Sequence, residues 1–175
     1  MSTRIVTLVG NPRPDSRTRA VAIQAAEIVS GRVGAAGQEI LDLSALAAAL
    51  ASPSASAVVE VAVETVRGAD VLVVATPTYK GTYTGLLKVF LDRLPGAALA
   101  SAVALPLMVM GDARHALAVE VHLRPVLVEL GAFVPTPGAV LLEDRIGQAG
   151  EILDGWADRI APQVVPVLAG RTAVA

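Results

Sequence analysis

The sequence predicts an α/β fold, a parallel sheet with helices on both faces, and three observations lead to it. Short stretches rich in β-branched and other apolar residues alternate with stretches of helical periodicity along the chain. The stretch 71–75 is continuously apolar, which is typical of a strand that is buried on both faces. With 175 residues, of which 54 % are apolar, the chain is long enough to bury a large core. We therefore expect a single domain, 1–175.

The individual elements are predicted from the start of the chain onward. The stretch from Arg4 to Val9 is rich in β-branched residues and predicts a strand, and apolar residues then recur at helical spacing from Ala20 to Ile28. The Ala- and Ser-rich stretch 44–57, which contains Pro53, has the weakest pattern and predicts a short helix and a loop. The predicted strands are 4–9, 38–43, 70–76, 102–110 and 133–142, and the predicted helices are 16–31, 56–68, 83–94, 113–130 and 148–169.

Five strands that alternate with five helices match a doubly wound, flavodoxin-like five-stranded parallel sheet with strand order 2-1-3-4-5. In such a sheet, ligands bind beyond the carboxyl ends of the strands, where the strand order reverses between strands 1 and 3. The loops after these two strands should therefore share one crevice.

The loop after the first strand, residues 10–18, is the most informative stretch of the chain. A helix begins inside it, so the first helical amides lack intrahelical partners and lie at the positive end of the helix dipole. The loop also carries amide, hydroxyl and guanidinium donors, which can bind a phosphate. These donors are Asn11, Arg13, Ser16, Arg17 and Thr18. A capped helix with solvated arginines is the simpler alternative for this loop taken alone.

The loop after the third strand, residues 76–85, strengthens the prediction of a phosphate-bearing cofactor. It is polar, carries both tyrosines of the chain, and has proline and glycine where the backbone must turn. The first loop has Pro12 where a dinucleotide fingerprint needs its second glycine, so a terminal monophosphate fits better. A flat ring against residues 77–83, with Gly111 and Asp112 at its other edge, describes flavin mononucleotide, FMN.

Three segments resemble the NADPH-dependent FMN reductases, and especially the alkanesulfonate-type reductases that serve flavin-dependent monooxygenases. Residues 10–18 are similar to the phosphate loop of that family, residues 75–95 to its Thr-Pro-x-Tyr-Lys motif and the following helix, and residues 111–125 to the segment after its fourth strand. The resemblance reaches from residue 4 to about 142. Asn11 stands where the family usually has serine, and Val121, followed by His122, stands where the alkanesulfonate-type enzymes have a tyrosine.

The resemblance implies hydride transfer from NADPH or NADH to FMN, chemistry that the cofactors carry without a catalytic side chain. We expect amides near Gly81, Thr82 and Gly111 to face the flavin pyrimidine, where negative charge accumulates on reduction. Lys80 is a candidate partner for the nicotinamide phosphate or the reduced flavin. The full set of expected cofactor-binding residues is Asn11, Arg13, Ser16, Arg17, Thr18, Pro77, Thr78, Tyr79, Lys80, Gly81, Thr82, Gly111 and Asp112.

The composition of the chain and the spacing of its residues limit the classes of partner that it can bind. A net charge of −2 and few aromatic residues argue against nucleic acid, and no apolar run reaches the roughly 20 residues that span a membrane. The absence of cysteine and of a signal-peptide pattern favours a cytoplasmic protein.

His115 and His122 are about 10 Å apart on a helix, too far to share one metal ion. From the resemblance we expect a homodimer or homotetramer and a flavin-dependent monooxygenase as partner.

Three alternatives stay open at this point. The same site can serve an FMN-bound quinone, azo-dye or metal-oxyanion reductase. It can also belong to a flavodoxin-like electron carrier without nicotinamide activity, although such carriers usually have a Thr- and Gly-rich phosphate loop and a strongly acidic face. A nucleotide-binding regulator would use Asp42, at the end of the second strand, as its ribose contact.

Overall fold

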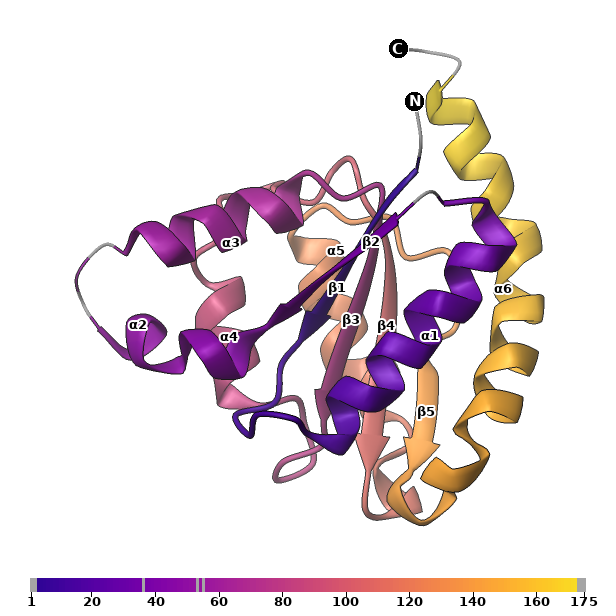
Figure 1. Cartoon of the computed structure of the whole chain (residues 1–175), viewed down its shortest axis with the longest axis horizontal. Coiled ribbons are helices and arrows are strands. Elements are labelled where there is room, and N and C mark those ends of the chain that lie inside the picture. Colours follow the sequence, from indigo (N-terminus) through magenta and orange to yellow (C-terminus); the bar gives the residue numbers. More distant parts are fainter. Residues whose placement is uncertain (1–2, 36, 53, 55, 173–175) are drawn as a thin grey trace.

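The computed structural model describes residues 3–35, 37–52, 54 and 56–172. Its five strands form one parallel sheet of order β2-β1-β3-β4-β5 (Figure 1), which confirms the predicted fold and strand order. Because β1 and β3 are neighbours, with Val9 opposite Ala75, the loops that follow them leave the sheet side by side. The strands are β1 (Arg4–Val9), β2 (Gly37–Asp42), β3 (Val71–Pro77), β4 (Val103–Met110) and β5 (Ala139–Leu142).

Helices cover both faces of the sheet. One face packs against α1 (Arg17–Val33) and α6 (Ala149–Thr172), and the other against α3 (Ala57–Arg67), α4 (Gly85–Leu91) and α5 (Arg124–Glu129), as Figure 1 shows. All residues of β3 and β4 are buried, which agrees with their continuous apolar sequence. No helix within the described residues has the length and apolar character needed to cross a membrane. The shorter elements are η1 (Leu43–Leu46), α2 (Ala47–Ala51), η2 (Ala113–His115), η3 (Val119–Leu123) and η4 (Glu143–Gln148).

The last strand was predicted too long. Phe133 makes one isolated bridge to Val103, and regular pairing resumes only at Ala139. Pro135 and Pro137 lie between them, and proline has no N–H to donate to a neighbouring strand. The segment between Phe133 and Ala139 is held by Arg124 instead, whose guanidinium donates to the carbonyl oxygens of Val134 and Thr136.

The predicted helix 113–130 is also wrong as one continuous element. It divides into the 3-10 turn η2, the π-helical turn η3 and the α-helix α5. Pro125 explains part of this, because it has no N–H to give to the carbonyl of Val121 in an α-helical turn. The N–H of Arg124 instead bonds to the carbonyl of Val119, five residues back.

Two other predictions need smaller corrections. The helix predicted for 83–94 is observed as the shorter α4, whose start is capped by the side chain of Thr84, which accepts from Leu87 N. The stretch 44–57 contains η1 and α2, as predicted, but Pro53 lies outside the described residues.

Candidate functional site

A buried hydrogen-bonded junction joins the loops after β1 and β3. Gly10 N donates to Ala75 O over 2.7 Å, and Thr84 Oγ1 donates to Gly10 O over 2.5 Å. The N–H of Thr84 in turn donates to Thr76 Oγ1 over 3.2 Å. Thr76, Thr84 and Gly10 are all buried, so these bonds fix the two loops relative to each other. The structure thus brings together the two loops that the sequence places at the switch point.

The first loop delivers its donors at the start of α1. Ser16 is the N-cap and accepts from Arg19 N over 3.2 Å, so its hydroxyl hydrogen stays available to a ligand. Arg17 and Thr18 begin the helix, and their N–H groups belong to the first turn, which has no intrahelical acceptors. Amides and hydroxyls therefore converge at the positive end of the helix dipole.

Asn11 has a different place from the other donors of this loop. Its Nδ2 donates to Thr18 Oγ1 over 3.1 Å, and its Oδ1 accepts from Arg13 N over 3.0 Å. Both polar ends of the buried amide are thus satisfied inside the loop. Asn11 therefore shapes the loop, and its position agrees with a supporting role better than with a direct contact to a phosphate.

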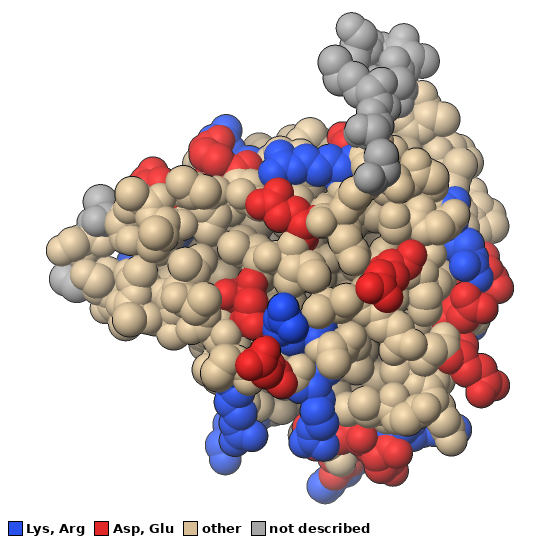
Figure 2. Space-filling view, viewed as in Figure 1, with Lys and Arg blue, Asp and Glu red and all other residues tan. Residues whose placement is uncertain are grey.

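The arginines near this loop differ in how they are paired. Arg17 forms an ion pair with Glu143 over 2.8 Å, and Arg19 lies 3.4 Å from Asp42. In the described part of the chain no carboxylate pairs with Arg13, which is exposed at the tip of the loop. Figure 2 shows blue and red side chains side by side along this lower edge of the molecule, where the strands end. The edge thus carries mixed charge, and Arg13 extends from the loop before α1 without a carboxylate partner among the described residues.

The second loop is a tight hairpin. Tyr79 N donates to Thr82 O over 2.8 Å, and Thr82 N donates back to Tyr79 O over 3.3 Å. Lys80 and Gly81 between them have φ angles of 53° and 83°, the left-handed conformation that a type I′ turn requires. Thr82 N is therefore occupied within the hairpin, which leaves Gly81 as the better placed of these two predicted amide donors.

Left-handed backbone at residues other than glycine is uncommon and gathers at functional sites. The described chain has it at Asp15, Lys80 and Ala97, and the first two lie in the two loops of this site. Lys80 is exposed, and no carboxylate of the described residues pairs with it. The hairpin thus places the exposed, unpaired Lys80 at its turn, at the edge of the surface formed by the two loops.

The remaining predicted residues lie at the ends of β3 and β4. Pro77 is the last, buried residue of β3, and Thr78 N donates to Val109 O over 2.9 Å, which keeps this segment against β4. Asp112, after Gly111, accepts from Arg114 N over 2.9 Å and pairs with its guanidinium over 2.6 Å. These side-chain and backbone hydrogen bonds from Arg114 lower the pKa of Asp112 to about 2, so the carboxylate stays ionised near neutral pH.

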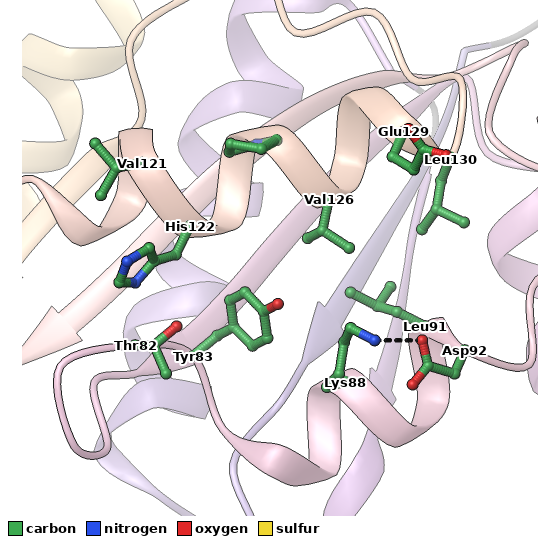
Figure 3. A pocket seen from close by; sticks show the side chains of 11 residues that line it. Thr82, Tyr83, Lys88, Leu91, Asp92, Val121, His122, Val126, Glu129 and Leu130 are labelled. Atoms are coloured by element: carbon green, nitrogen blue, oxygen red, sulfur yellow. Dashed lines mark hydrogen bonds and ion pairs between the residues drawn. The ribbon is translucent and has the colours of Figure 1, made fainter.

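A groove of about 700 Å³ runs beside the second loop, between α4 and the segment formed by η3 and α5. Figure 3 shows His122 directed toward Thr82 at one end of the groove and the Lys88–Asp92 ion pair at the other. The hydrogen bond from Lys88 to Asp92 raises the pKa of the lysine, so its ammonium stays protonated at neutral pH. Val121, which lines the groove, is exposed, and so is Val89 on α4, which leaves apolar side chains near the predicted flavin loop.

Sequence reasoning missed three residues of this site. Thr76 and Thr84 join the two loops, and Glu143 reaches the start of α1 from the end of β5. A signal existed for Glu143, because it directly follows the last predicted strand and parallel strands end at one edge. The threonines carry no such signal, since nothing in the sequence shows where a hydroxyl donates.

The observed geometry fits a bound FMN phosphate. The N–H groups of Arg17 and Thr18 at the helix start, the hydroxyl of Ser16 and the guanidinium of Arg13 supply amide, hydroxyl and cationic donors. The side chain of Thr18 is buried and accepts from Asn11, so it supports the loop from inside. Asp42 does not favour the alternative of a ribose contact, because its carboxylate already accepts from Ser44 N and pairs with Arg19.

Comparisons with known proteins agree with this geometry. The family model of NADPH-dependent FMN reductases matches residues 3–145. The chain is 39 % identical to an FMN reductase (NADPH) of Escherichia coli (strain K12) over 129 residues. These aligned residues make up 74 % of this chain and 68 % of that protein. It is 31 % identical over 126 residues to the NADH-dependent FMN reductase SfnF of Pseudomonas putida, or 70 % of this chain and 68 % of that protein. The apo structure of the NADH:FMN oxidoreductase EmoB superposes with a TM-score of 0.72 at 35 % identity, covering 89 % of each chain.

Proposed function

The chain belongs to the NADPH-dependent FMN reductase family, and from that premise we propose that residues 1–175 act as one domain in which loops 10–18 and 76–85 hold FMN. The junction of Gly10, Thr76 and Thr84 is the observation that supports this most, because it fixes the two loops as one surface. The enzyme is an oxidoreductase that uses FMN with NADPH or NADH.

The bound flavin supplies the hydride-accepting ring, and the chain's own residues bind and orient it. The start of α1 would hold the phosphate through the Ser16 hydroxyl and the N–H groups of Arg17 and Thr18, assisted by the guanidinium groups of Arg13 and Arg17. The hairpin around Gly81 lies along the ring and offers a backbone amide to its pyrimidine side. Gly111 and Asp112, which follow β4, would contact the flavin from the neighbouring strand end. We therefore propose that these residues bind and orient the flavin, and we place no proton transfer on a side chain.

We propose that the reduced flavin goes to a flavin-dependent monooxygenase. One supporting observation is the likeness to the NADH-dependent reductase SfnF of Pseudomonas putida. A location in the cytoplasm stays a prediction that rests on the absence of cysteine.

Oxidation of NADPH and NADH, measured separately under air with FMN, FAD or riboflavin, tests this function. Oxidation that requires added flavin supports the reductase. A yellow protein that oxidises neither nucleotide would instead be an electron carrier. Faster turnover with a quinone, an azo dye or a metal oxyanion than with free flavin would favour the alternative acceptor class.

Lys80 should act on the nicotinamide nucleotide, because its charge is unpaired on the rim of the site. We expect Lys80→Ala to raise the KM for NADPH about tenfold, the usual effect of losing one charge-assisted hydrogen bond. Lys80→Asn is the matched variant, because asparagine also lacks the ammonium group but tolerates the left-handed backbone better than alanine. Unchanged KM and turnover in both variants would remove Lys80 from the site.

We also propose that the protein is a homodimer or homotetramer that associates through α4 and η3. Val121 lines the groove and is exposed, Val89 is exposed on α4, and burying such apolar surface favours association. Light scattering at micromolar concentration should give at least twice the monomer mass of 17.9 kDa. The charged variant Val121→Asp should shift this mass toward the monomer, and a wild-type monomer would contradict the proposal.

A further inference from the structure

A carboxylate from the far end of the chain lies at the corner assigned to the flavin phosphate. Glu143 directly follows β5, and its Oε2 is 2.8 Å from Nη2 of Arg17, the first residue of α1. The first turn of α1 has no acidic residue of its own. The only anionic contact of Arg17 among the described residues therefore comes from Glu143, across 126 positions of sequence.

This ion pair uses the same positive groups that would attract a phosphate. A helix start and a guanidinium stabilise any nearby anion, so a carboxylate and a phosphate compete for them. The side chains of Arg17 and Glu143 are 63 % and 40 % exposed, and an ion pair this open to solvent contributes little to stability. A dianion can therefore displace Glu143 from Arg17 at small cost. The displaced carboxylate nevertheless stays tethered to the end of β5 and repels the dianion.

We propose that Glu143 weakens the binding of the flavin phosphate and thereby keeps FMN exchangeable. The inference rests on the proposed function, because it requires the phosphate to bind at the start of α1. Oxidised and reduced FMN carry the same phosphate, so weaker binding applies to both and favours release of the reduced product. Glu143 is thus a residue that sets affinity through charge, and it needs no contact with the flavin ring.

Glu143→Gln tests this proposal, since glutamine keeps a hydrogen-bonding side chain of similar size and loses the charge. We expect the Kd for FMN, measured by quenching of flavin fluorescence, to fall roughly three- to tenfold, as one unit charge acting on a dianion through water predicts. The Kd for riboflavin, which lacks the phosphate, should stay the same. The gain for FMN should shrink at high salt, because salt screens exposed charges. Stopped-flow displacement should also show slower dissociation of FMN.

Two further variants isolate the route of the effect. Glu27→Gln makes the same change of charge at an exposed site on α1, about 15 Å along the helix from Arg17, and should leave both affinities unchanged. In an Arg17→Gln background most of the gain from Glu143→Gln should remain, because the carboxylate repels the dianion whether or not the guanidinium is present. An FMN affinity that stays constant or falls in Glu143→Gln would overturn the inference, and so would an equal gain for riboflavin. Wild-type protein that binds neither flavin would refute the proposed function itself.

Discussion

Replacing Gly10 with alanine is expected to lower the free energy of unfolding by about 3 kcal/mol, at the upper end for an overpacked core. A Cβ atom at this position would lie 2.7 Å from Leu87 Cβ and 3.1 Å from its Cγ. Leu87 is fully buried on α4, so neither side can move away into solvent. The strain should also displace the carbonyl of Gly10, which accepts from Thr84 and joins the two loops of the site. We therefore expect FMN affinity to fall together with stability.

Chemical denaturation and a flavin titration of the same variant measure both effects. Gly31→Ala is the matched control, because Gly31 lies inside α1 and an added Cβ would have no neighbour within 4 Å. This control should be slightly stabilising, by about 0.5–1 kcal/mol, since alanine is the better helix former. If Gly10→Ala unfolds like the wild type, or keeps full FMN affinity, then the junction does not couple the fold to the site.

The central strands could be predicted closely because their signal is local. β1 starts and ends where its β-branched residues predict, and β3 and β4 differ from prediction by single residues. Continuous apolar sequence is enough here, since each of these strands is buried on both faces. The alternation with helices then predicts a doubly wound parallel sheet, and in the observed order 2-1-3-4-5 strands β1 and β3 are neighbours, which brings the two loops together.

The helix and strand after β4 were harder to predict because several prolines act through their missing N–H. Pro125 lies inside an apolar helical pattern, and the pattern alone does not show that the preceding turn widens into η3. Pro135 and Pro137 similarly interrupt a stretch that reads as one strand. In both places a tertiary contact completes the structure, because Arg124 binds the carbonyl groups that the interrupted strand leaves without partners.

Residue types at the site could be predicted, but their partners could not. The sequence shows that Asn11 can donate to a phosphate, and only the structure shows that its amide is already paired with Thr18 and Arg13. Glu143 is the opposite case, because a loop carboxylate gains meaning only from the arginine it meets. A list of donors therefore overstates direct contacts and omits the groups that oppose binding.

Ser16→Asp should separate stability from flavin binding more sharply than any other change in the phosphate loop. Aspartate is as good an N-cap as serine and can accept from Arg19 N in the same way. A negative charge at the first turn also interacts favourably with the positive end of the helix dipole, so we expect the variant to be as stable as the wild type or slightly more so. The new charge, however, occupies the place assigned to the phosphate.

We expect Ser16→Asp to weaken FMN binding by at least about 100-fold, because a unit charge a few ångströms from a dianion costs several kcal/mol near a protein surface. Riboflavin, which carries no phosphate, should lose little affinity. Ser16→Asn is the matched control, since it caps the helix equally well without a charge and should lose only the hydroxyl donor. Equal losses for FMN and riboflavin would mean that aspartate distorts the loop. Unchanged FMN binding in a well-folded Ser16→Asp protein would place the phosphate away from the start of α1, because a dianion and a carboxylate cannot share that corner without a large electrostatic cost.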